Sequence, residues 1–65
     1  MKTVVVARGG HQSVGEHLAE MQAWLAQEQI VARELVMLHV LNFRVVFRAT
    51  FERDADADQF TERFG

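Results

Sequence analysis

The chain has 65 residues, a net charge of −2 and 49% hydrophobic residues, which predicts a single domain over residues 1–65 with a small core. It contains no cysteine, so disulfides and thiolate metal sites are excluded. The mildly acidic balance demands neither nucleic acid nor an anionic membrane as a partner.

Residues 2–8, KTVVVAR, predict the first strand, because β-branched residues favour sheets and the pair Gly9-Gly10 breaks the run. The apolar part of this segment is too short for a signal peptide or a membrane span. We therefore expect a cytoplasmic protein without membrane contacts.

A helix is predicted over about residues 14–28. Ser13 and Glu16 stand at capping-box spacing just before it, so the Ser13 hydroxyl can accept from the N–H of Glu16. The apolar stripe of this helix consists of Val14, Leu18, Met21 and Leu25, bordered by His17 and Trp24.

Residues 30–41 are ambiguous, because no glycine or proline separates them from the first helix. A strand is favoured, since residues 43–51 alternate with a period of two and a hairpin turning near Leu41-Asn42 gives consistent pairs. Those pairs are Val40 with Phe43, Leu38 with Val45, Val36 with Phe47, His39 with Arg44, Met37 with Val46 and Leu35 with Arg48. Leu-Asn is not a favoured two-residue turn, so a helical alternative stays open.

The last element is a helix within residues 53–65, with Asp54 as N-cap and Asp56 near the positive end of the helix dipole. Its apolar stripe is Ala57, Phe60 and Phe64. The order is then βαββα, which predicts a two-layer α+β domain with a three-stranded mixed sheet in the order 2-3-1 and both helices on one face. This arrangement is similar in topology to a ferredoxin-like fold that lacks its last strand.

Phe43, Phe47 and Phe51 share one face of the third strand, and the opposite face carries arginines. The phenylalanines are expected to face the helices, because burying unpaired guanidinium groups costs several kcal/mol each. The open face then has an apolar centre with an arginine border, the composition of a protein interface. The expected contact residues are Leu35, Met37 and Val46, with Arg44 and Arg48 at the rim.

The leading interpretation is therefore a small protein-interaction module without enzymatic activity. It is expected to form a homodimer, or to bind another protein, through the open sheet face or the edge of the first strand. The alternative is an anion- or nucleic-acid-binding module that uses Arg33, Arg44 and Arg48, whose binding would weaken steeply with salt.

Other motifs give weak signals. The Gly9-Gly10 loop before a capped helix could hold an anion, but it lacks the residues of a phosphate loop. His11, His17 and His39 have no metal-ligand spacing, and DADAD at residues 54–58 lacks the glycine and glutamate of a calcium loop. Ser13 and Thr50 have no visible base partner. We expect no catalytic residue, no metal and no cofactor.

Overall fold

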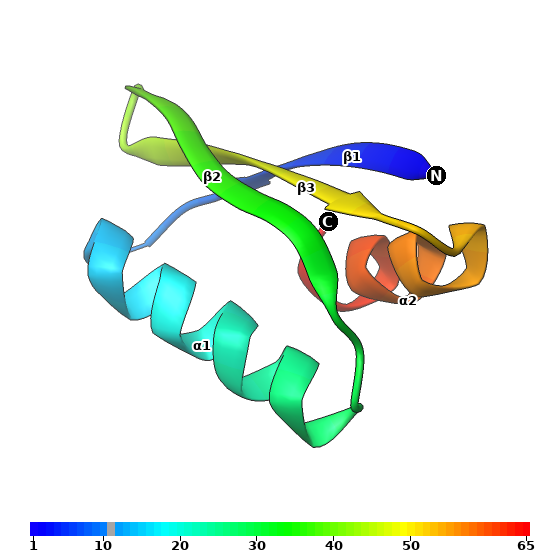
Figure 1. The fold of residues 1–65 in the computed structure, drawn as a ribbon. Helices are drawn as coiled ribbons and strands as arrows, with labels where there is room; N and C mark the ends of the chain where they lie inside the picture. The colour runs from blue at the N-terminus through cyan, green and yellow to red at the C-terminus, as the bar shows by residue number, and fades with distance from the viewer. Residues whose placement is uncertain (11) are drawn as a thin grey trace.

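The computed structural model describes residues 1–10 and 12–65. The elements in chain order are β1 (Lys2–Arg8), α1 (Val14–Gln27), β2 (Ala32–Leu41), β3 (Arg44–Phe51) and α2 (Asp54–Phe64). The strands form one three-stranded sheet in the order β1-β3-β2, and Figure 1 shows both helices on the same side of it. The predicted α+β class and strand order are confirmed, and residues 32–41 are a strand rather than a helix.

The sheet is antiparallel throughout, so the predicted mixed sheet is wrong. Both β1 and β2 pair antiparallel with the central strand β3. β1 and β2 run in the same direction, as expected for two strands joined through a helix. They are separated by β3, however, and no parallel ladder can form between them.

The core lies between the sheet and the two helices. β3 contributes every second residue, and these are Val45, Phe47, Ala49 and Phe51. α2 contributes Ala57, Phe60 and Phe64, which confirms its predicted stripe. Trp24 of α1 packs edge-on against Phe60 and Phe64, with ring centroids 6.1 and 5.6 Å away. Aromatic contacts therefore join the two helices to each other and to the sheet.

α1 begins as the sequence predicts. The Ser13 hydroxyl accepts a 3.2 Å hydrogen bond from the N–H of Glu16. Met21 and Leu25 of the predicted stripe are buried. His17 differs from its expected border position, since it is only 1% exposed and lies edge-on against Phe47 in the core.

α1 ends without glycine or proline in a left-handed C-terminal motif. Gln29 has φ 57°, the N–H of Ile30 donates to the carbonyl of Leu25 at 2.9 Å, and the N–H of Gln29 donates to Ala26 at 3.2 Å. This pair of bonds satisfies the last carbonyls of the helix. It also turns the chain toward β2, which explains how helix and strand separate where the sequence shows no breaker.

The start of α2 differs by one residue from the prediction. Arg53 occupies the N-cap position and its side chain makes no capping hydrogen bond, so Asp54 is the first helical residue. Asp54 and Asp56 lie in the first turn, where the positive end of the helix dipole favours carboxylates.

The β2–β3 hairpin turns one residue later than predicted. Its central residues are Asn42 and Phe43, with φ values of 50° and 65°. A type I′ turn requires positive φ at both positions, which asparagine tolerates and phenylalanine does not. Phe43, expected in the core, is consequently in the turn and 92% exposed.

A bulge at Leu38 reverses the facing of the first half of β2. Met37 pairs with Phe47 and Leu35 with Ala49, while Leu38 has no partner residue on β3. One extra residue sends every side chain beyond it to the opposite face of the sheet. Leu35 and Met37 therefore face the helices, and the prediction that they lie on the open face with Arg48 is wrong.

Candidate functional site: an exposed apolar hairpin

The open face of the sheet, opposite the helices, carries part of the predicted contact set. Val46, Arg44 and Arg48 lie on it, because the alternate residues of β3 are buried. Val5 of β1 is paired with Arg48 and is 59% exposed. Val36 of β2 is also paired with Arg48 and takes the place that Leu35 and Met37 were expected to have.

The arginines of the predicted anion site are mostly neutralised by carboxylates. Arg48 lies 2.8 Å from Glu34, and Arg33 lies 3.0 Å from Glu52. Within residues 1–10 and 12–65, Arg44 makes no ion pair. One unpaired guanidinium does not form a platform for a polyanion, so the charge arrangement does not favour the nucleic-acid alternative.

The largest accumulation of exposed hydrophobic side chains lies at the closed end of the β2–β3 hairpin. We call it the hairpin patch, and its members are Met37, Leu38, Val40, Leu41 and Phe43, exposed by 42, 40, 57, 59 and 92%. With about 150–250 Å² for a large side chain, these fractions amount to roughly 500 Å². Met37 and Val40 face the helix side and Leu41 faces the open side, so this area is divided between the two faces of the hairpin end rather than forming one contiguous patch.

Phe43 is the most unusual member of the hairpin patch. It stands at the second turn position, where glycine after asparagine gives the most favourable hairpin turn. A left-handed conformation costs a residue with a side chain roughly 1–2 kcal/mol. The aromatic ring recovers none of this cost by burial, since it is 92% exposed. Backbone strain without a folding benefit is typical of residues kept for binding.

The two outer strands of the sheet differ in how they are protected. β1 has a charge at each end: Lys2 pairs with Asp58 at 2.7 Å, and Arg8 donates to the carbonyl of Phe64 at 3.3 Å. The hydrogen bond to Asp58 raises the pKa of Lys2. Charged residues on an outer strand oppose pairing with a further strand.

The outer edge of β2 carries Arg33 and Glu34 at its start and register shifts at Arg33 and Leu38, but the rest of the strand is apolar apart from His39. Residues 35–41, LVMLHVL, contain no aspartate, glutamate, lysine, arginine, proline or glycine. Such a segment at a sheet edge favours the addition of another strand. We predicted an interface on the open sheet face or at the edge of β1 and did not consider the edge of β2, although the absence of aspartate, glutamate, lysine and arginine from residues 35–41 was an available signal.

Other polar groups do not assemble a chemical site among the described residues. His17 is buried in the core and its Nδ1 has no hydrogen-bond partner, whereas His39 is exposed on β2. His11 lies outside the described residues. Over residues 1–10 and 12–65, no three histidine, aspartate or glutamate side chains gather closely enough to hold a metal ion. In the same part of the chain, neither helix is long and apolar enough to cross a membrane.

A hollow of about 350 Å³ lies beside α2 and is lined by Trp24, Gln59, Glu62 and Arg63. Glu62 and Arg63 are exposed. The hollow offers one aromatic surface with mixed charges around it, and no pair of polar groups converges there to orient a ligand.

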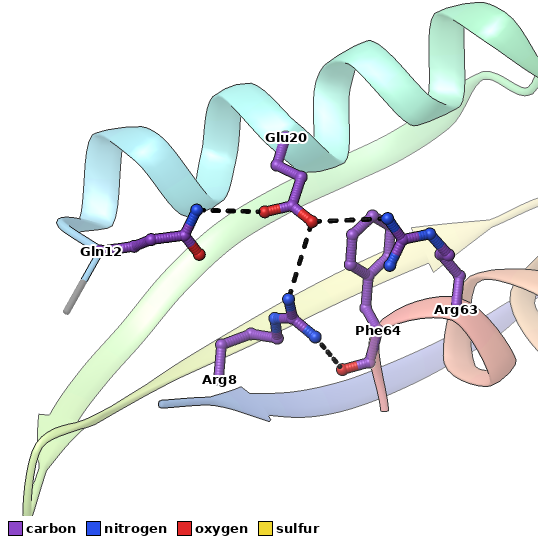
Figure 2. A network of polar contacts seen from close by, with 5 residues as sticks. All are labelled: Arg8, Gln12, Glu20, Arg63 and Phe64. Atoms are coloured by element: carbon purple, nitrogen blue, oxygen red, sulfur yellow. Dashed lines mark hydrogen bonds and ion pairs between the residues drawn. The ribbon is translucent and has the colours of Figure 1, made fainter. Parts of the chain in front are cut away.

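A polar cluster that shares Arg63 with this hollow joins both helices to β1 (Figure 2). Glu20 of α1 lies 3.7 Å from Arg8 of β1 and 3.5 Å from Arg63 of α2, and it accepts a 3.4 Å hydrogen bond from Gln12. The two guanidinium groups also stack on Phe64, at 5.4 and 4.9 Å from its ring centre. The cluster is internally paired, so we assign it a structural role.

No protein-family model, no curated protein and no solved structure matches this chain.

Proposed function

We propose that this chain is a small protein-interaction domain that binds its partner through the hairpin patch. The topology is similar to a ferredoxin-like fold without its last strand. It leaves the outer edge of β1 and the outer edge of β2 without a neighbouring strand. A 65-residue domain has little apolar surface to spare for its own core. Exposing about 500 Å² of it at one end of a hairpin is costly in water and is recovered when a partner covers the patch.

Phe43 carries this proposal. An exposed aromatic side chain is the kind of anchor that contributes much of the binding energy in protein interfaces when a partner buries it. Its left-handed backbone lowers the stability of the free domain, so the residue serves the complex rather than the fold. No catalytic or anion-binding role has comparable support among the described residues.

The test is the substitution Phe43→Gly, measured by chemical denaturation at low micromolar concentration. Glycine relieves the left-handed conformation and completes an Asn-Gly turn, so the free energy of unfolding should rise by about 1 kcal/mol. Asn42→Ala, which introduces a less tolerant residue at the other turn position, should lower it. A loss of stability on Phe43→Gly would show that the ring supports the fold, and the proposal would fail.

A further inference from the structure

We infer that the partner at the hairpin patch is a second copy of this chain, joined by antiparallel pairing of the two β2 edges into a continuous six-stranded sheet. The inference rests on the proposed interaction function and names its partner. It differs from both expected seams, the open sheet face and the edge of β1.

The first support is the difference between the two edges. A two-fold axis places identical strands side by side, so the edge must be compatible with itself. An uncharged apolar edge meets this condition, whereas an edge carrying Lys2 and Arg8 would bring charged side chains toward the seam. β2 also carries charges at its start, Arg33 and Glu34, but its run without aspartate, glutamate, lysine or arginine, residues 35–41, is longer than the run 3–7 of β1.

The second support is the facing of the β2 side chains. Residues paired across a seam must point to the same face of the sheet. Met37 and Val40 face the helix side, while Val36 and Leu41 face the open side. A two-fold axis between Leu38 and His39 places Met37 opposite Val40 of the second copy and Val36 opposite Leu41 of the second copy. At the axis itself, Leu38 lies opposite His39 of the second copy. Both faces then match, with an apolar pair on each.

The third support is the amount of surface available. A standard protein interface buries about 800 Å² on each partner. The hairpin patch offers roughly 500 Å² of side-chain surface per copy by the estimate above. The backbone of β2 and the partly buried side chains Leu35 and Val36 provide further contact area. A second copy of a 65-residue chain is thus large enough to cover the patch.

The flank of α1 on the side away from α2 is compatible with such a seam. Trp24 and Glu20 mark the side that faces α2. The opposite side carries no charge and consists mainly of small residues, namely Gly15, Leu18, Ala19, Gln22 and Ala26. Small side chains allow the α1 helices of two joined copies to approach closely over the seam.

The test uses sedimentation equilibrium from low micromolar to millimolar concentration, in low and in high salt. Val40→Lys and Val5→Lys form a matched pair, since the native side chains are 57 and 59% exposed on opposite outer strands. We expect a dimer that persists in high salt. Val40→Lys should weaken it by about ten-fold or more, because each dimer buries two new charges, and Val5→Lys should leave it within about two-fold.

Cysteine trapping locates the seam independently, because the chain has no native cysteine. Leu38→Cys places one cysteine of each copy beside the proposed axis. A disulfide needs the two Cα atoms to be about 4.4–6.8 Å apart, and neighbouring positions at the axis of two paired strands meet this condition. It should yield a covalent dimer under mild oxidation, and Val5→Cys should not.

A dimer that is weakened by Val5→Lys, or trapped by Val5→Cys instead of Leu38→Cys, would place the seam elsewhere and overturn the inference. A strict monomer up to millimolar concentration would overturn it as well. Neither result would decide the interaction function, which is tested separately through the stability of Phe43→Gly.

Discussion

Glu20 of α1 and Arg8 of β1 face each other across the gap between helix layer and sheet, with 3.7 Å between the carboxylate oxygen and the guanidinium nitrogen. Arg63 of α2 approaches the same oxygen of Glu20 at 3.5 Å (Figure 2). One carboxylate therefore joins two consecutive elements, β1 and α1, to the C-terminal helix α2. The side chains are partly exposed, so solvent screens these contacts.

Removing the charge of Glu20 should cost a small amount of stability that depends on salt. Glu20→Gln leaves two guanidinium groups facing each other without a counter-charge, and the free energy of unfolding should fall by about 0.5–1 kcal/mol in low salt. The loss should shrink in 1 M salt because the Debye length falls to about 3 Å. Urea unfolding followed by the fluorescence of Trp24 measures both values.

The matched control for Glu20 is Glu62→Gln on the exposed side of α2. Glu62 makes no ion pair within residues 1–10 and 12–65. Its substitution should leave the free energy of unfolding nearly unchanged. Equal losses for the two variants would show that the cluster around Glu20 contributes nothing specific.

Replacing His17 with leucine should stabilise the domain. The side chain is 1% exposed, and its Nδ1 has no partner among the described residues. A buried polar atom without a hydrogen bond costs about 1–3 kcal/mol. The edge-on contact with Phe47, worth about 0.5–1.5 kcal/mol, is lost in exchange. The expected net gain is about 1 kcal/mol in urea unfolding.

The conservative comparison for His17 is glutamine, which keeps a polar group in the same apolar site. His17→Gln should bring no gain, because the cost of burying an unpaired group remains. If leucine instead lowered the stability by more than 1 kcal/mol, the imidazole would be making a favourable polar contact in solution.

The ion pair between Lys2 and Asp58 should make the free energy of unfolding decline with pH in the alkaline range. The hydrogen bond from Lys2 to Asp58, with the attraction of the same carboxylate, raises the pKa of Lys2 in the folded state. A raised lysine pKa stabilises the fold fully below the unfolded value of about 10.4, and this contribution is lost as pH rises through the folded value. Asp58→Asn should remove the part of the alkaline decline in unfolding free energy that comes from Lys2.

Unfolding measured between pH 9 and pH 12, a range chosen around the lysine pKa of about 10.4, checks this expectation. Glu62→Gln serves again as the control and should retain the alkaline decline of the parent chain. The same pH profile for the Asp58→Asn variant and the parent would contradict a role of Asp58 in holding the Lys2 charge.

Much of the fold follows from short-range patterns in the sequence. The period of two in β3 and the apolar stripe of α2 correctly predict the buried residues from Val45 onward, whereas in α1 only Met21 and Leu25 of the predicted stripe are buried and His17 joins them. The Ser13 cap is also a local interaction, between residues three positions apart. The element order and the short connections then limit the strand order to the one observed.

Which side of the sheet each β2 side chain points to depends on two features that local patterns do not encode. Asn42-Phe43 is an unfavourable turn sequence, and it forms because pairing along the whole hairpin outweighs the strain at Phe43. The bulge at Leu38 carries no glycine or proline as a signal. Together these features move Leu35 and Met37 to the helix side and Phe43 out of the core. The sequence by itself determined the elements and the core of β3 and α2, whereas the tertiary structure decided the register, since register depends on contacts summed over two strands at once.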